Sequence, residues 1–491
     1  MKIRVIGGGL AGPEAALTAA RLGCEVDLYE MRRVVDGKPV LTPAHQTTDF
    51  GELVCSNSLK SESEWTAPWL LKQEMRRGGS ALLKIADETA VPAGHALAVD
   101  RVRFSQRISE AIAAEPRIRV IREEVTSLEP SDLEIVATII ATGPLTSDAL
   151  STEIARLTGS AHLAFYDSIS PIVDADTIDM SRVYFAARWD KGTADYINCP
   201  MDRAEYDRFY EALLAAEAAE SKEWEKLADF PPHAPNSGAS GPRYFESCLP
   251  IEVLASRGRD TLRFGPMKPV GLRDPRTGKT PWAVVQLRKE NLRADSYNLV
   301  GFQNHLKFGE QARVLRLIPG LENARFLRYG QIHRNTYICA PALLDECLRL
   351  QRGSLGAHSG SPTLSPKEGD KGGATSILFA GQICGVEGYT ESIASGLLAG
   401  IYAAALARGE EPTPVPRATA LGSLVHYITH ADPKNFQPAN ITFDLLEPLD
   451  EETRRKVRDK KERHRMQCER ALAAFDMWYA AQHLRFTATS R

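Results

Sequence analysis

MKIRVIGGGLAGPEAA, residues 1–16, is the stretch that decides the fold class of this chain. A β-branched strand runs into a glycine-rich turn, and an alanine-rich helix follows. This order is typical of the phosphate-binding start of a dinucleotide-binding fold, because the helix N-terminus points unpaired N–H groups at an anion. We expect Gly7 to permit the tight turn, Gly9 to let the backbone approach a pyrophosphate, and Gly12 to let the helix pack on the strand. The predicted cofactor contacts of this turn are Gly7, Gly8, Gly9, Leu10, Ala11 and Gly12.

A second predicted strand, residues 25–29, ends at Glu30. An acidic side chain at this place accepts both hydroxyls of an adenosine ribose and disfavours a 2′-phosphate. A lone G-x-G-x-x-G motif is weak evidence, but strand, glycines, helix, second strand and terminal Glu occur here in order. The motif therefore predicts bound FAD or NAD.

A later segment favours FAD over NAD. Residues 375–382 read as an apolar strand ending in Ala-Gly, and a small-residue helix is expected over 391–396. The start of such a helix directs backbone N–H groups at the pyrimidine end of an isoalloxazine. A middle strand and turn at residues 139–144 completes the pattern of an FAD fold. The predicted contacts from these segments are Gly143, Gly381 and Gln382.

These elements, spread from the first to the last third of the chain, predict an interrupted domain. The expected fold class is α/β: an FAD-binding Rossmann-like domain of the glutathione-reductase type, interrupted by an inserted α+β domain. We assign residues 1–184 and 375–491 to the FAD-binding domain and residues 185–350 to the inserted substrate or RNA domain. Residues 351–374, rich in Gly, Ser, Pro and charge, are expected to form a flexible loop.

The composition is typical of a soluble intracellular enzyme. The 491 residues are 43% hydrophobic and 25% charged, which is enough to bury a large core in two or more domains. No apolar run is expected to reach the length of a membrane span. The 8 cysteines show no C-x-x-C spacing, so we expect no metal site, no disulfide framework and a cytoplasmic location.

A basic segment near the C-terminus is a candidate polyanion-binding surface. The net charge is −3, so a polyanion partner needs a local basic patch. Residues 454–465 carry far more basic than acidic side chains, inside a helical pattern that continues to Trp478 and Tyr479. On charge alone, a solvated helix face and an RNA-contacting surface explain this segment equally well. The candidate contacts are Arg454, Arg455, Lys460 and Lys461.

Two cysteines are candidate nucleophiles. Cys55 lies in the polar stretch DFGELVCSNSLK, residues 49–60, after the first βαβ unit. Cys248 lies between aromatic and proline-containing segments that suit the edge of a pocket. A thiolate attacks an electron-poor ring carbon when cationic neighbours lower its pKa. Taken alone, each cysteine fits the role of a small buried hydrophobic residue better.

Long strings spread over most of the chain are far more specific than a nucleotide fingerprint. They are GGGLAGPEAA (7–16), ELVCSNSLKS (52–61), VPAGHALAVDR (91–101), ATGPLTS (141–147), FESCLPIE (245–252), GPMKPVGL (265–272), GFQNHLKFGEQ (301–311), FAGQICGVEGYTESIASG (379–396) and DKKER (459–463). These strings closely resemble the folate- and FAD-dependent tRNA (uracil-54-C5-)methyltransferase family (TrmFO/Gid). Two departures are a longer Gly/Ser-rich loop before Ser376 and Phe308 at a place where a Trp is expected.

The resemblance implies a flavin-mediated methyl transfer to uridine 54 in the T-arm of tRNA. 5,10-Methylenetetrahydrofolate would donate the carbon to reduced FAD, the flavin would pass it on to uracil C5 and reduce it, and NAD(P)H would restore FADH2. Uracil C5 becomes nucleophilic only after a thiolate adds at C6. By resemblance, Cys248 is that nucleophile and Cys55 is a general base or partner thiol.

The same resemblance implies roles for two aromatic residues and for the basic segment. Tyr389 is expected to stack near the flavin and Phe308 near the reacting groups, and the uridine has to leave its stack to reach them. An RNA substrate supplies phosphates, which favours the RNA-contacting interpretation of residues 454–465.

Three other functions stay open from the sequence. One is a related flavoprotein that helps to modify the wobble uridine of tRNA, in which the ELVCSNS string is not expected. Another is a ribosomal-RNA uridine C5-methyltransferase with the same chemistry. The third, a non-catalytic flavin-containing RNA-binding protein, would need neither Cys55 nor Cys248.

Overall fold

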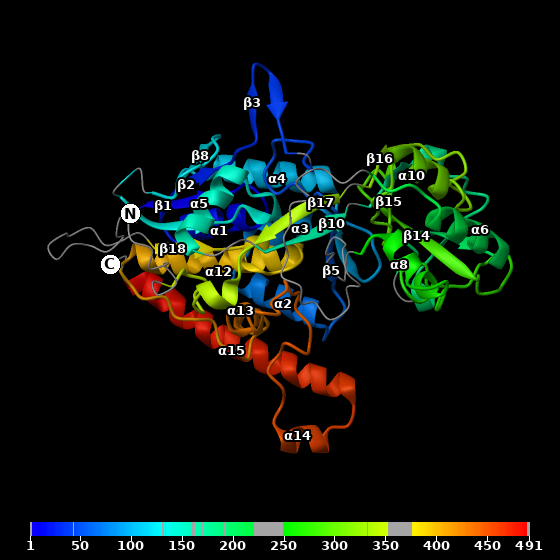
Figure 1. The fold of residues 1–491 in the computed structure, drawn as a ribbon. Helices are drawn as coiled ribbons and strands as arrows, with labels where there is room; N and C mark the ends of the chain where they lie inside the picture. The colour runs from blue at the N-terminus through cyan, green and yellow to red at the C-terminus, as the bar shows by residue number, and fades with distance from the viewer. Residues whose placement is uncertain are drawn as a thin grey trace.

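Two bodies, each with its own sheet and core, make up the described chain (Figure 1). The computed structural model describes residues 2–42, 44–129, 132, 134–159, 163–168, 170–190, 193–219, 249–330, 332–351 and 376–488. Cys248 lies outside these residues, and so do residues 352–374 of the predicted loop.

The first body is built on a parallel five-stranded sheet with the strand order β18-β9-β1-β2-β8. Its strands are β1 (Lys2–Ile6), β2 (Glu25–Tyr29), β8 (Ile118–Ile121), β9 (Ile135–Ile140) and β18 (Ser376–Phe379). β9 and β18 are nearly continuous runs of buried apolar residues, as expected for strands covered on both faces. Because all neighbours are parallel, the turns after β1, β2, β9 and β18 meet at one edge of the sheet.

Two helices cross very closely on one face of this sheet. α1 (Ala11–Arg21) packs against α12 (Tyr389–Ala407), which is drawn in yellow in Figure 1. A Cβ atom on Gly396 would lie 2.4 Å from the Ala11 carbonyl oxygen, and one on Gly400 would lie 2.7 Å from that of Ala15. The small residues of α12 therefore set the distance between the two helices.

The length of α12 corrects one expectation from the sequence. The helix is long and apolar enough to cross a membrane by length and composition, although no apolar run of that kind was expected. Within its most apolar window, 89% of the residues are buried in the structure. Its apolar surface is therefore used for packing against the sheet and against the helices on its other side.

A further layer of helices lies beyond α12 (Figure 1). It contains α2 (Ala67–Arg77), α13 (Ala420–His430) and α15 (Lys460–Ala488). Glu74 of α2 is buried and accepts hydrogen bonds from the backbone N–H groups of Ala420 (2.7 Å) and Leu421 (2.9 Å), at the start of α13. The carboxyl group thus ties two helices of this layer together.

The remaining elements of the first body surround the sheet. They are the hairpin β3–β4 (Arg33–Val35 and Lys38–Val40), the small sheet of β5 (Ser58–Ser61), β7 (Ala96–Val99) and β6 (Ala90–Val91), and the helices α3 (Ala81–Glu88), α4 (Arg101–Ala114), α5 (Asp148–Thr158) and α11 (Ala340–Leu343).

The second body contains a six-stranded sheet in which every described neighbouring pair is antiparallel. In spatial order its strands are β12 (Tyr184–Ala186), β13 (Tyr196–Met201), β14 (Ala283–Lys289), β15 (Ser296–Leu299), β11 (Ile172–Asp174) and β16 (Phe326–Arg328). The helices beside it are α6 (Arg203–Leu214), α8 (Ile251–Ser256), α9 (Thr261–Phe264) and α10 (Phe308–Leu315).

The limits of this second sheet differ from the predicted domain at 185–350. β11 begins at Ile172, and β16 ends at Arg328, while residues 337–348 pack in the core of the first body. Between the bodies, β10 (Leu163–Ser168) pairs with β17 (Ile332–Tyr337) in an antiparallel ribbon. β11 has three residues and pairs with distant strands, which is why local sequence patterns missed it.

The basic segment forms two helices and not one long helix. α14 (Glu451–Lys456) ends at Lys456, and α15 begins at Lys460. Figure 1 shows α14 standing away from the rest of the first body. The fold class predicted from the sequence, an α/β dinucleotide-binding arrangement, is confirmed, whereas the division into domains stays a prediction.

Candidate active site

A cavity lies at the carboxyl edge of the parallel sheet. The turns after β1, β2, β9 and β18 all contribute to its wall, which is where ligands of open α/β sheets bind. The predicted cofactor residues that line it are Gly7, Gly8, Gly9, Leu10, Ala11, Glu30, Gly143, Gly381, Gln382 and Tyr389. Gly12 does not line the cavity; a Cβ atom there would lie 1.9 Å from the Gly7 carbonyl oxygen, so this glycine permits the helix to pack on the turn.

The glycine turn leaves open space where a dinucleotide pyrophosphate would lie. A Cβ atom on Gly9 would meet no atom within 4 Å, and the same holds for Gly143 across the cavity. Gly7 adopts φ +116°, a value that favours glycine, and a Cβ atom there would lie 2.4 Å from the Ala141 carbonyl oxygen. The residues present therefore fit a dinucleotide: backbone N–H groups at the start of α1 face a space that only glycine keeps free.

Glu30 lies at the predicted position, at the end of β2 and on the cavity wall. Its carboxylate accepts hydrogen bonds from the Gly8 backbone N–H (2.7 Å) and from the backbone N–H (2.8 Å) and Nε (3.0 Å) of Arg32. Arg32, 2% exposed, balances the buried charge of Glu30 and also reaches Glu52 at 3.5 Å. The acid is thus fixed beside the glycine turn, and its contact with a ribose stays a prediction.

Tyr389 joins the cavity to the loop that carries Cys55. The phenol is on the cavity wall at the start of α12, and its oxygen accepts hydrogen bonds from the backbone N–H groups of Cys55 (2.7 Å) and Ser56 (3.2 Å). Burial, reinforced by Cys55, raises the pKa of Tyr389 well above its usual value, so the phenol stays neutral. Cys55 is therefore held next to the predicted flavin site by a residue 334 positions away in the chain.

Two partly buried guanidinium groups lie within electrostatic range of Cys55. Arg101 donates to the Leu53 carbonyl (2.5 Å) and forms an ion pair with Glu290 (2.8 Å). Burial opposes the charge of Arg101, but Glu290 and the nearby Tyr389 and Cys55 raise its pKa overall. Positive charge at this place favours a thiolate at Cys55.

The second guanidinium belongs to Arg328, at the end of β16. It donates to the Ala44 carbonyl (3.0 Å). Burial, and then the charge of Arg101, lower its pKa, while Tyr389, Glu52 and Cys55 oppose that shift. Arg328 belongs to the second body, and its guanidinium group adds a second positive charge near Cys55.

The second body also holds the loop after Cys55 by direct hydrogen bonds. Asn57, fully buried, donates through Nδ2 to the carbonyl oxygens of Lys289 (2.8 Å) and Val99 (3.0 Å). Arg288 donates to Ser56 Oγ (2.7 Å). The Cys55 loop is thus fixed between the two bodies.

Cys248, the predicted nucleophile, lies outside the described residues, and its position relative to Cys55 stays a prediction. Four residues later, Glu252 of α8 accepts a hydrogen bond from the His305 backbone N–H (2.7 Å). Its other oxygen is buried without a hydrogen-bond partner in the part of the chain that the structure describes. Burial raises the pKa of Glu252 to about 7, so this carboxyl can exchange a proton near neutral pH.

Phe308 is the first residue of α10 and is 52% exposed. Its ring stacks on Tyr329 (centroids 5.2 Å apart), and Tyr329 stacks on Phe326 (5.4 Å). Phe326 and Arg328 belong to the same strand, β16. The aromatic stack is therefore joined to the strand that carries Arg328, one of the two charges near Cys55. The exposed ring of Phe308, supported by this stack, offers a surface to a flat heterocycle.

The predicted RNA contacts carry less free charge than the sequence suggested. Arg455 forms an ion pair with Glu451 (3.2 Å), and the neighbouring Lys456 forms one with Glu452 (2.5 Å), each across one turn of α14. Arg454 lies on α14 as well, whereas Lys460 and Lys461 start α15 on the other side of the break. Whether these residues contact RNA stays a prediction.

Arg101, Glu252, Glu290 and Arg328 were not among the residues selected from the sequence. Arg101 ends the string VPAGHALAVDR, and Glu252 ends FESCLPIE. Their place in these family-specific strings could have identified both residues from the sequence. Glu290 and Arg328 stand in no such string. Only the tertiary structure brings them to the Cys55 loop.

Comparisons with known proteins agree with this arrangement. The family model described as "Glucose inhibited division protein A" (GIDA) matches residues 2–354 and 370–411. A Koribacter versatilis protein named methylenetetrahydrofolate–tRNA-(uracil-5-)-methyltransferase TrmFO is 64% identical over 99% of both chains. A Solibacter usitatus protein of the same name is 58% identical over 96% of this chain and 98% of its own.

Among solved structures, Aquifex aeolicus GidA in its form I crystal is similar, with a TM-score of 0.63 and 18% identity. The match covers 98% of this chain and 76% of that one, and it supports the fold alone. The GIDA match spans most of the chain, and the 64% identity is shared with a protein named TrmFO. This chain therefore belongs to the GIDA family and, within it, to the methylenetetrahydrofolate–tRNA-(uracil-5-)-methyltransferases named TrmFO.

Proposed function

We propose that this protein methylates C5 of uridine 54 in the T-arm of tRNA, with 5,10-methylenetetrahydrofolate as carbon donor and NAD(P)H as reductant. The observation that carries the proposal is the connection of the dinucleotide cavity to Cys55 through the Tyr389 hydroxyl. The names of the relatives support folate as donor and tRNA as substrate. Uridine position 54 and the reductant rest on the resemblance of the sequence.

FAD is the resident cofactor that best fits the cavity. The open space at Gly9 suits its pyrophosphate, Glu30 suits its ribose, and the start of α12 suits its ring. Reduced FAD, when bound, supplies the electrons that convert the one-carbon unit to a methyl group. The protein's own part is to place the uracil, the folate carbon and two thiols around that ring.

The proposed chemistry at the uracil needs a nucleophile and a base. The Cys248 thiolate adds to C6, and the electron pair released to C5 attacks the methylene carbon. The Cys55 thiolate then removes the proton from C5, and the electron pair that this leaves expels the nitrogen that carried the one-carbon unit. A hydride, which reduced FAD would supply when bound, adds to the resulting exocyclic methylene as the Cys248 thiolate leaves C6. Arg101 and Arg328 favour the charged form of Cys55 that this proton transfer requires.

The RNA surface is proposed from charge and aromatic stacking. The residues at the end of α14 and the start of α15 would contact phosphates without reading the sequence. The stack of Phe308 on Tyr329 offers a face to a base or to a folate ring. For such chemistry on RNA we also propose a cytoplasmic location, which agrees with the free buried thiols of Cys24, Cys199, Cys347, Cys384 and Cys468.

The test is a methylation assay with the purified full-length protein. Unmodified tRNA, the same tRNA with uridine 54 replaced by cytidine, and ribosomal-RNA fragments are incubated with methylene-labelled folate and NADPH or NADH. We expect label in the first tRNA alone, and none with S-adenosylmethionine as donor. Label in ribosomal RNA alone would move the proposal to the rRNA enzyme, and methylation from S-adenosylmethionine would overturn the flavin–folate chemistry.

A further inference from the structure

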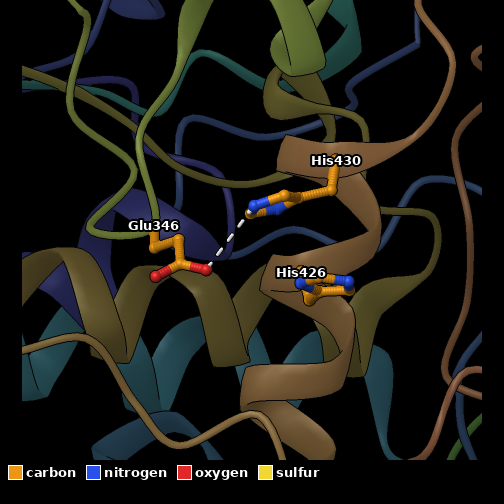
Figure 2. A group of neighbouring side chains, drawn as sticks. All are labelled: Glu346, His426 and His430. Carbon is orange, nitrogen blue, oxygen red and sulfur yellow. Dashed lines mark ion pairs between the residues drawn. The ribbon is translucent and has the colours of Figure 1, made fainter.

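Three side chains that can bind a metal ion meet on the first body, apart from the cavity described above (Figure 2). His426 and His430 are four residues apart on α13, so they lie on one face of the helix. Their rings stack with centroids 4.3 Å apart. Glu346, in the loop after α11, places Oε1 3.7 Å from Nε2 of His430. One ligand atom from each residue can be chosen so that all three lie within 4.8 Å of one another.

The loop presents Glu346 from a fixed backbone. Asp345 Oδ1 accepts hydrogen bonds from the backbone N–H groups of Cys347 and Arg349, each at 2.9 Å, and Oδ2 accepts from Arg349 Nε at 2.9 Å. The flanking Leu344 and Leu348 are fully buried. In contrast, the side chains of Glu346 and His430 are 51% and 49% exposed, so both can turn toward an ion arriving from solvent.

A hydrogen bond to Thr429 orients the ring of His430. Thr429 Oγ1 lies 2.8 Å from the Val425 carbonyl oxygen and 2.9 Å from Nδ1 of His430. The hydroxyl has one proton, and when it donates that proton to the Val425 carbonyl its oxygen accepts from the Nδ1–H tautomer of His430. In the neutral ring the lone pair is then on Nε2, which faces the Glu346 carboxylate. Histidine ligands of metals are oriented in this way, by a hydrogen bond from the other ring nitrogen.

The donor set indicates which class of ion would bind. Two imidazoles and one carboxylate are the ligands of zinc sites that keep a fourth position for water, whereas Mg²⁺ and Ca²⁺ prefer oxygen ligands throughout. Bonds of about 2.0–2.2 Å in a tetrahedral site require ligand atoms about 3.4 Å apart. Rotation of the two half-exposed side chains closes the difference from the present spacing.

We infer that Glu346, His426 and His430 form a binding site for a divalent transition-metal ion of the Zn²⁺ class. The ion would tie α13 to the loop at residues 344–351. The inference differs from the expectation of no metal site, which rested on cysteine spacing and did not consider a pair of histidines one helical turn apart.

The inference is tested by metal binding to the full-length protein after treatment with a chelator. Zn²⁺ is titrated against a chromophoric competitor, and Co²⁺ is used separately to read the ligand geometry from its visible spectrum. We expect one site per chain that is lost in the double variant His426→Ala/His430→Ala. Loss of an outer partner weakens metal sites about 10- to 100-fold, so Glu346→Gln should weaken binding at least about 10-fold.

Two further variants distinguish a built site from general surface binding. Thr429→Val keeps the shape of the buried side chain and removes the acceptor of Nδ1–H, and it should weaken Zn²⁺ binding about 10-fold. His95→Ala, at an exposed histidine in the turn between β6 and β7, should change nothing. Binding that is unchanged in the double histidine variant, or that disappears only after the cysteines are alkylated, would overturn the inference.

Discussion

The glycine turn at residues 7–12 and the loop around Cys55 border the same site, but they are built in different ways. The glycine turn is held by its own neighbours: the Gly7 carbonyl lies against Gly12, and Glu30 accepts from Gly8. The Cys55 loop is held by Tyr389, and the Arg101 that binds its Leu53 carbonyl is in turn paired with Glu290 of the second body. A local motif therefore gives the glycine turn, whereas the loop around Cys55 depends on contacts from distant segments, including the second body.

The largest effect is expected from a substitution in the glycine turn. Gly9→Val places a branched side chain in space that no atom of the protein occupies and that the pyrophosphate needs. The purified variant should fold and lose the flavin absorbance completely. Gly309→Ala is the matched control, since a Cβ atom there also meets nothing within 4 Å but lies in α10 of the second body. Normal flavin content in Gly9→Val would contradict the cofactor assignment.

The proposed roles of Cys55 and Cys248 are tested by replacing each cysteine in turn. Cys248→Ala and Cys55→Ala should keep FAD and lose methylation by at least about 10²-fold, because a positioned base or nucleophile contributes at least that much. Only Cys248→Ala should lose the covalent adduct with RNA, and Cys55→Ala should trap it. Cys199→Ala, at a fully buried cysteine of β13, is the control and should lower stability while activity persists. An active Cys248→Ala enzyme would show that Cys248 is not the nucleophile.

The proposed influence of the second body on Cys55 is tested at Arg328. Arg328→Met keeps most of the stem and removes the charge that favours the Cys55 thiolate, so alkylation of Cys55 by iodoacetamide at pH 7 should slow about 10-fold. Arg316→Met is the control, because Arg316 also binds a carbonyl oxygen, that of Ala324, within the second body. Equal alkylation rates of Cys55 in the wild type and Arg328→Met would show that this charge does not act on the thiol.

The contrast between the two loops also explains what the sequence could predict. β1, the glycine turn, β9 and β18 follow from contiguous patterns, and the structure has them as expected. The second sheet begins earlier than predicted because β11 is three residues long and gains its stability from β15 and β16. The positions of Glu290 and Arg328 depend on contacts between distant segments. The break between Lys456 and Lys460 is not marked by the basic pattern of the sequence. The roles of Cys55 and Cys248 came from resemblance, since neither cysteine carries a local signal of its own.

Two buried carboxyl groups, Glu14 and Glu74, make the stability of the first body depend on pH. Glu14 of α1 follows the glycine turn and accepts from the backbone of Ala81 (3.2 Å) and Leu82 (2.8 Å), whereas Glu74 binds the start of α13. Burial raises the pKa of Glu14 to about 7 and that of Glu74 to about 8. For each group the folded state binds the proton more tightly than the unfolded state, whose ordinary value is 4.5. The stability that each contributes is complete below pH 4.5 and is lost as the pH rises through the folded value.

The smallest predicted effect is a pH dependence that separates these two groups. Between pH 7.5 and 8.5 Glu74 still titrates and Glu14 does not, so the unfolding free energy should fall with pH by at most about 1.4 kcal/mol per unit. Glu74→Gln should flatten this fall, and Glu14→Gln should leave it in place. Between pH 5 and 7 both carboxyl groups contribute to the slope, so each substitution should remove about half of their joint contribution there. Denaturant unfolding at half-unit pH steps measures both slopes. If neither slope changes, both carboxylates are ionised in the folded protein across this range, and their four backbone N–H donors outweigh burial.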